Sequence, residues 1–169
     1  MINLVNGNGQ LGEVLKHSVN SVSVSEDIYI YHTWNIEVKG EIEQRREYDK
    51  LVAFVDEKKN NKIIFISTAS TTDSWYTHYK QLAESYLLQN CSNGMVLRLP
   101  CFIGKGPVAN FRDPSVEAFG VMEVVSLQQA ADYVINKINY EGLIKCHTMI
   151  VTGKQGSLST IPLEQFCNK

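Results

Sequence analysis

The sequence has few cysteines, few prolines, no long apolar run and no excess of charge of one sign. It contains four cysteines and four prolines in 169 residues, and its formal net charge is -2. Acidic and basic residues are interspersed, which argues against nucleic acid or an anionic membrane surface as the main partner. No apolar run approaches the roughly 20 residues that a membrane-spanning helix needs. Residues 1–7 have no basic lead and no long apolar core, so we expect no signal peptide.

Neither the cysteines nor the histidines are spaced for a metal site or a disulfide framework. The cysteines include no Cys-x-x-Cys pair, and the four histidines are scattered along the chain. A domain of this size with 44% apolar residues has enough core material to fold without disulfides. We therefore expect reduced structural thiols in a cytoplasmic protein, and no metal ion.

The first third of the chain predicts a strand, a glycine turn and a helix, followed by a second strand. Residues 2–5 are apolar, residues 6–12 are rich in glycine, and apolar residues then recur at helical spacing to about residue 17. Residues 18–25 are too polar and too short for a whole strand-helix unit. Residues 27–32 are rich in β-forming side chains and predict the second strand.

The rest of the chain alternates between helical and strand patterns. Amphipathic spacing predicts a helix over 41–59, a second one capped by Asp73 or Ser74, and a third that a capping box of Ser126 and Gln129 begins. Further strands are predicted over 62–67, 95–99, 121–125 and 148–152, a loop over most of 101–120, and a last helical turn over 162–166. This alternation predicts an α/β fold over residues 1–169: a single Rossmann-like domain with a doubly wound, mainly parallel sheet.

The glycine turn carries the first functional signal. Gly7-x-Gly9-x-x-Gly12 stands between a predicted strand and a predicted helix, which is the context that a dinucleotide-binding turn requires. Small residues let the backbone approach a pyrophosphate, and the helix N-terminus offers unpaired N–H groups. Glycines also form ordinary tight turns, so that interpretation stays open beside the first.

An acidic residue about 20 positions after the turn would bind the ribose hydroxyls of a dinucleotide. Glu26 and Asp27 stand at about this distance. Asp27 begins the predicted second strand, however, whereas the ribose-binding acid stands at a strand end. The sequence therefore does not assign this residue.

Tyr76 and Lys80 stand one helical turn apart on the same predicted face. An ammonium beside a phenol lowers the pKa of the phenol, which suits a proton relay at a sugar hydroxyl or carbonyl. Tyr79 also neighbours Lys80, and the spacing favours Tyr76. Thr68 and its neighbouring hydroxyl residues follow a predicted buried strand, where ligands bind in open parallel sheets. A half-buried aromatic beside a surface lysine, with helix-capping hydroxyls, is the alternative.

Four segments, in order, resemble the extended short-chain dehydrogenase/reductases. Residues 6–12 resemble the first turn of this family, especially the form in dTDP-4-dehydrorhamnose reductases. Gly9 and Gly12 match the last two glycines, Asn6 replaces the first, and Gly7 is displaced by one. The other three segments are 63–68, 76–84 and 96–106, which resemble the strand with the catalytic hydroxyl, the catalytic helix and the nicotinamide-side loop.

The resemblance implies an NAD(P)-dependent oxidoreductase or epimerase that acts on a nucleotide sugar, in a pathway such as cell-surface polysaccharide synthesis. The residues that it implies as catalytic are Thr68, Tyr76 and Lys80. The residues that it implies as cofactor-binding are Gly7, Gly9, Gln10, Leu11, Gly12, Lys80 and Pro100.

The chain also departs from the family pattern. Residues 27–32 resemble the fourth strand of the family rather than its second, so about two strand-helix units, including the one that holds adenosine, are missing. Only eight positions separate Thr68 from Tyr76, and little of the C-terminal sugar-binding lobe is present. A non-catalytic binding or regulatory subunit that has lost cofactor binding is therefore the second hypothesis. The helices over 41–59 and 76–89 resemble the dimer-forming pair of the family, so the resemblance implies a homodimer through them. Tyr79 and Tyr86 on the second helix would otherwise be core residues.

Overall fold

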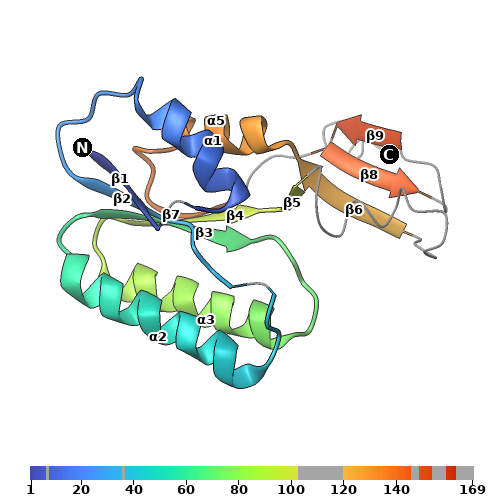
Figure 1. Ribbon diagram of the computed structural model, residues 1–169, viewed down its shortest axis with the longest axis horizontal. Helices are drawn as coiled ribbons and strands as arrows, with labels where there is room; N and C mark the ends of the chain where they lie inside the picture. The colour runs from blue at the N-terminus through green and yellow to red at the C-terminus, as the bar shows by residue number, and fades with distance from the viewer. Residues whose placement is uncertain (7, 36, 103–119, 146–148, 154–158, 163–169) are drawn as a thin grey trace.

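The computed structural model describes residues 1–6, 8–35, 37–102, 120–145, 149–153 and 159–162. Its main sheet has five parallel strands in the order β1-β2-β3-β4-β7 (Figure 1). The strands are β1 (Ile2–Val5), β2 (Ile28–Tyr31), β3 (Lys62–Thr68), β4 (Gly94–Leu99) and β7 (Gly142–Lys145). The predicted α/β class with a mainly parallel, Rossmann-like sheet is confirmed.

Two helices cover each face of the main sheet. On one face lie α1 (Gln10–Val19) and α5 (Leu127–Asn136), and on the other lie α2 (Glu41–Lys58) and α3 (Trp75–Asn90), as Figure 1 shows. The predicted helix over 41–59 thus ends one residue earlier. Ser74 caps α3 by accepting a hydrogen bond from the Thr77 amide, and the capping box of Ser126 and Gln129 begins α5.

The strand β3 lies at the centre of both hydrophobic cores. Ile64 and Ile66 pack in the core under α1 and α5, whereas Ile63 and Phe65 pack in the core under α2 and α3. Successive side chains of a strand point to opposite faces, so a strand with helices on both sides needs apolar residues at every position. The helices on both faces of β3 therefore explain the continuous apolar run over 62–67.

A second, smaller sheet continues from the end of β4. Its order is β5-β6-β8-β9, with β5 parallel to β6 and the other pairs antiparallel. The strands are β5 (Cys101–Phe102), β6 (Gly120–Val125), β8 (Met149–Gly153) and β9 (Ser159–Pro162). Pro162 ends a strand, which corrects the predicted helical turn at its first residue; residues 163–166 and Thr148 lie outside the described residues.

In many doubly wound sheets the first strand is central, and later strands are added on both sides of it. The sheet of this protein is different. Among the described strands β1 is at an edge, and the order runs one way from β1 to β7. The helices after β1 and β2 nevertheless cover opposite faces (Figure 1). The crossovers from β1 to β2 and from β2 to β3 therefore step in the same direction along the sheet but pass over opposite faces, so they have opposite hands. Nearly all crossovers between parallel strands of one sheet are right-handed.

This arrangement determines where a ligand would bind. In open α/β sheets, ligands bind beyond the carboxyl ends of adjacent strands whose following helices lie on opposite faces. The strands β1 and β2 meet this condition here without any reversal of strand order. All five strands are parallel, so the residues that follow Val5, Tyr31, Thr68 and Leu99 share one edge, which we call the carboxyl edge.

Candidate functional site

The glycine turn lies at the carboxyl edge and leads into α1. Gly9 is the N-cap residue of α1, in an extended conformation with φ -87° and ψ 172°, and no side chain caps the helix. A Cβ atom added to Gly9 would meet no atom within 4 Å, so the space around it is open. Before the turn, Asn6 has a φ of 53°, in the left-handed region. Gly7 lies outside the described residues.

The other predicted cofactor residues of the turn differ in exposure. Leu11 and Gly12 are buried against the sheet, whereas Gln10 is exposed. Because the Leu11 side chain belongs to the core under α1, only its backbone N–H group is placed to meet a ligand. The first turn of α1 therefore offers backbone donors and the positive end of a helix dipole.

The acidic residues considered for ribose binding lie at the opposite edge of the sheet. Asp27 precedes β2 and forms an ion pair with the N-terminal amine, with 3.1 Å between Asp27 Oδ1 and the nitrogen. Glu26 accepts a hydrogen bond from the same amine through its backbone oxygen. Neither residue is near the glycine turn, since that turn follows the other end of β1.

Thr68 and Tyr76 are brought together at the carboxyl edge. Thr68 is the last residue of β3, and Tyr76 is the second residue of α3. The Thr68 side chain lies close enough to the Tyr76 hydroxyl to lower its pKa. The eight positions between them are thus enough for contact.

Lys80 lies inward from this pair and is fully enclosed. Its Nζ donates a hydrogen bond of 2.8 Å to the backbone oxygen of Ile66. The same atom lies 5.1 Å from the ring centroid of Trp34, 5.0 Å from that of Phe65 and 5.6 Å from that of Tyr76. Burial lowers the pKa of Lys80 to about 7, against the opposing effect of the Glu84 and Glu47 carboxylates.

The expected lowering of the phenol pKa by an adjacent ammonium is wrong for this structure. Burial raises the pKa of Tyr76, and the nearby Thr68 side chain only partly opposes this effect. The reason lies in the direction of Lys80, whose amine is bound to a backbone carbonyl on β3 and not to the phenol oxygen. At neutral pH, Tyr76 is a protonated phenol.

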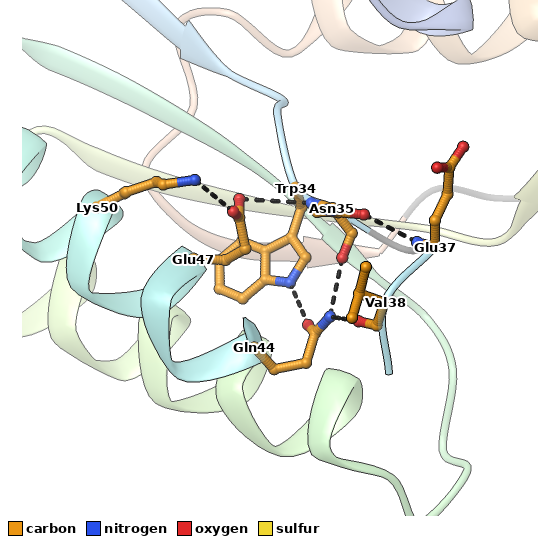
Figure 2. Close-up of polar contacts among 7 residues, drawn as sticks. All are labelled: Trp34, Asn35, Glu37, Val38, Gln44, Glu47 and Lys50. Carbon is orange, nitrogen blue, oxygen red and sulfur yellow. Dashed lines mark hydrogen bonds and ion pairs between the residues drawn. The ribbon is translucent and has the colours of Figure 1, made fainter. Parts of the chain in front are cut away.

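The loop between β2 and α2 covers Lys80, and Figure 2 shows how it is fixed. Gln44 is fully buried on α2; it accepts a hydrogen bond of 2.7 Å from Trp34 Nε1 and donates to the backbone oxygens of Asn35 and Val38. Glu47, one turn along α2, accepts from the Asn35 amide and pairs with Lys50. Sequence reasoning missed this cluster, although Gln44 stands seven residues before the buried Leu51 on the same helical face.

Ser67 is engaged by Glu84, one turn from Lys80 on α3. Its hydroxyl donates a hydrogen bond of 2.5 Å to Glu84, and Arg98 binds the same carboxylate through two nitrogens. This buried network links β3, α3 and β4 and holds α3 against the sheet. Pro100, predicted beside the cofactor, is buried directly after β4 at the carboxyl edge.

One histidine at the carboxyl edge was not singled out from the sequence. His32 follows β2 directly, and its Nε2 is buried without a hydrogen-bond partner. Burial lowers the pKa of His32, and Lys80 and Lys16 add to the effect. Its only signal in the sequence was its place after a predicted strand.

The described residues contain neither a candidate metal centre nor a helix suited to crossing a membrane. Over residues 1–145 and the described strands beyond, leaving out the gaps given above, no group of three or more histidine, cysteine, aspartate or glutamate side chains is arranged to hold a metal ion. None of the helices that the structure describes has both the length and the apolar character needed to cross a bilayer.

No protein-family model and no curated protein sequence matches the chain. Solved structures do match it. A hypothetical dTDP-4-dehydrorhamnose reductase from Sulfolobus tokodaii is 16% identical with a TM-score of 0.67, and the match covers 95% of this chain and 77% of that one. The Bordetella bronchiseptica enzyme WbmG, in complex with NAD and UDP, is 13% identical with a TM-score of 0.61, covering 94% and 74%.

A third match has nearly the same extent as this chain. It is a putative NAD-dependent epimerase/dehydratase from Bacillus halodurans, 10% identical with a TM-score of 0.58, covering 99% of this chain and 98% of that one. Identities this low establish a common fold and nothing finer. At that level the resemblance drawn from the sequence is confirmed: the chain shares the fold of these dTDP-4-dehydrorhamnose reductase and epimerase/dehydratase structures.

Proposed function

We propose that this protein is an NAD(P)-dependent reductase of a nucleotide sugar that bears a carbonyl group. The observation that carries the proposal is the position of Thr68 beside Tyr76 at the carboxyl edge, with Lys80 one turn inward. The fold supports the cofactor class, because structures with the same fold were solved with NAD bound. One of them also holds UDP, which supports a nucleotide-linked substrate.

The residues of the chain fit one end of the cofactor. The uncapped first turn of α1 and the open space around Gly9 suit a diphosphate, and Pro100 and Lys80 stand on the nicotinamide side in this proposal. No acidic side chain among the described residues of the carboxyl edge of β1 or β2 replaces the missing ribose-binding acid. When bound, NAD(P)H supplies the hydride that the reduction requires.

The protonation state of Tyr76 favours reduction over oxidation. Because burial raises the pKa of this phenol, Tyr76 holds a proton at neutral pH and can donate it to a carbonyl oxygen as a hydride reaches the carbonyl carbon. Thr68 then orients the same oxygen through its hydroxyl. The phenolate left on Tyr76 makes a charged Lys80 more favourable, so Lys80 supports the step by electrostatic attraction.

The test is a reduction assay with NADH or NADPH and a 4-keto nucleotide sugar such as dTDP-4-dehydrorhamnose. We expect turnover by the wild-type protein and a loss of about 10²–10⁴-fold in kcat for Tyr76→Phe, since proton donation is removed. The matched control is Tyr79→Phe, because Tyr79 is a buried neighbour on the same helix. Equal turnover of Tyr76→Phe and wild type would exclude the assigned role of Tyr76.

A non-catalytic binding or regulatory subunit is the second candidate function. It is favoured by the edge position of β1, which leaves no described strand to hold adenosine, and by the enclosure of Lys80 under Trp34. A protein of this kind would bind a diphosphate ligand without turnover. Binding of NAD+ with no reduction of any keto sugar nucleotide would favour it over the reductase.

We also propose that the protein forms a homodimer through α2 and α3. Four apolar side chains on these two adjacent helices are exposed by 38–64%: Ile42, Trp75, Leu82 and Leu88. Such a surface is covered in dimers with a four-helix interface. Light scattering after gel filtration is expected to give twice the chain mass of 19.1 kDa. Leu82→Glu should return it to one chain mass, whereas Leu143→Glu, on β7, should not.

A further inference from the structure

The free nitrogen of His32 is the feature of the carboxyl edge that the proposed function does not use. Among the described side chains that are not exposed, its Nε2 is the one buried nitrogen or oxygen atom without a hydrogen-bond partner. A buried polar atom without a partner costs about 1–3 kcal/mol, so its position calls for a ligand or a functional reason.

The position of His32 relates it to the glycine turn. Tyr31 is paired with Val5, so His32 stands beside Asn6, where the turn begins. Ile28 and Ile30 face α1, and His32 has the same parity along the strand. His32 thus lies on the face where the uncapped first turn of α1 begins.

We propose that His32 gains a proton when a diphosphate-bearing ligand binds at the glycine turn, and that its Nε2 then donates a hydrogen bond to a phosphate oxygen. This inference rests on the proposed function for the place of the ligand. A neutral imidazole carries a single ring proton, and its Nδ1–H tautomer has only a lone pair on Nε2, which repels a phosphate oxygen. Protonation converts that lone pair into a charged donor.

The surrounding charges determine how binding and protonation are linked. Two cations act on the ring, Lys16 from α1 and Lys80 from α3, and burial acts in the same direction. Among the described residues, no acidic side chain acts on the pKa of His32. In the free protein the ring is therefore neutral at pH 7, and a bound diphosphate supplies the negative charge that the site lacks. Affinity should then rise as pH falls, by up to about tenfold per pH unit in the range where uptake occurs.

The test is calorimetric titration with NAD+ between about pH 5.5 and 8, repeated in buffers of different ionisation enthalpy. The phosphates of NAD+ are diesters and do not titrate in this range, so a change in affinity reports on the protein. UDP-glucose, with a diester diphosphate but no nicotinamide, is the second ligand, and nicotinamide riboside, without a diphosphate, is the control. The variants are His32→Gln, which keeps a neutral donor near the position of Nε2, and His17→Gln, on the exposed side of α1.

We expect proton uptake and tighter binding at low pH for wild type and His17→Gln, and for His32→Gln a smaller uptake, of which only the part due to Lys80 remains. Dependence with NAD+ but not UDP-glucose would identify a dinucleotide as the ligand, and dependence with both would identify the diphosphate alone. Binding of NAD+ without proton uptake, or an uptake as large in His32→Gln as in wild type, would overturn the role of His32 and leave the proposed function intact. If neither diphosphate ligand binds at any pH, both proposals fail.

Discussion

Glu84 on α3 and Arg98 on β4 form a two-point ion pair, with 2.6 Å between Arg98 Nη2 and Glu84 Oε2. The Glu84 side chain is 4% exposed and that of Arg98 34%, so the pair joins a buried carboxylate to a half-buried cation. Ser67 on β3 donates to the same carboxylate. Three elements that hold the candidate site are thus tied to one acidic residue.

Glu84→Gln is expected to lower the free energy of unfolding by about 2–4 kcal/mol, because it leaves Arg98 without its counter-ion and removes charge-assisted hydrogen bonds. Urea unfolding followed by circular dichroism measures this change. Glu13 and Lys16 form the matched exposed pair, and Glu13→Gln should leave the stability nearly unchanged. If the two variants lowered the free energy of unfolding by similar amounts, Glu84 would not be the residue that ties α3 to β3 and β4.

The buried Lys80 predicts a rise in stability with pH above neutrality. Its pKa falls from 10.5 in a free side chain to about 7 in the folded protein, so the unfolded chain binds more protons between these values. The destabilisation is complete below pH 7 and is relieved as pH rises. Between pH 7 and about 8.5 the free energy of unfolding should increase by about 1–2 kcal/mol.

Lys80→Met is the control for this pH effect, since it keeps the apolar stem and removes the titrating group. The increase between pH 7 and about 8.5 should vanish in the variant. His32 titrates below this range, and burial raises the pKa values of Cys91 and Cys101, which act above it. A wild-type protein whose stability is flat across the range would show that Lys80 is not enclosed as described.

Replacement of Gln44 is expected to loosen the loop that covers Lys80. Gln44→Leu leaves Trp34 Nε1 and two backbone oxygens without partners, at an expected cost of about 1–3 kcal/mol. Intrinsic tryptophan fluorescence should shift as Trp34 becomes exposed. Gln89→Leu, at an exposed position of α3, should change neither quantity. An unshifted spectrum in Gln44→Leu would show that this side chain does not hold the loop.

Replacement by alanine is expected to weaken ligand binding at Gly9 and to lower stability at Gly142. Gly9 has a φ that any residue adopts and open space around it, so Gly9→Ala should fold normally but bind NAD+ at least roughly tenfold more weakly, since its Cβ obstructs the diphosphate. Gly142 has a φ of 79°, so Gly142→Ala should lose about 1–2 kcal/mol of stability and keep its affinity. Thermal unfolding and calorimetry measure the two effects. Full affinity in Gly9→Ala would argue against a diphosphate at this turn.

The sequence alone determined the elements whose signals are local. The helix predicted over 41–59 is α2, and the capping box of Ser126 and Gln129 begins α5 as expected. The apolar run over 62–67 predicted a strand covered on both faces, which β3 is. Each of these rests on periodicity or on contacts within a few residues, and such signals are complete within a short window of sequence.

Elements that depend on distant partners were not predictable in this way. β7 has four residues and forms only because it pairs with β4, and Pro162 ends β9 because that strand pairs with β8. Their own sequences are too short to carry a period. Sheet pairing supplies the hydrogen bonds that decide such strands, and the sequence does not state which segments pair.

The candidate site divides along the same line. The sequence determined that Tyr76 and Lys80 share one helical face and that Thr68 ends a strand. Only the tertiary structure decided that Lys80 points to Ile66 under three aromatic rings, which leaves Tyr76 protonated, and that His32 keeps one buried nitrogen free. Spacing fixes which residues are neighbours on one element, whereas burial, charge and hydrogen-bond direction depend on what other elements place around them.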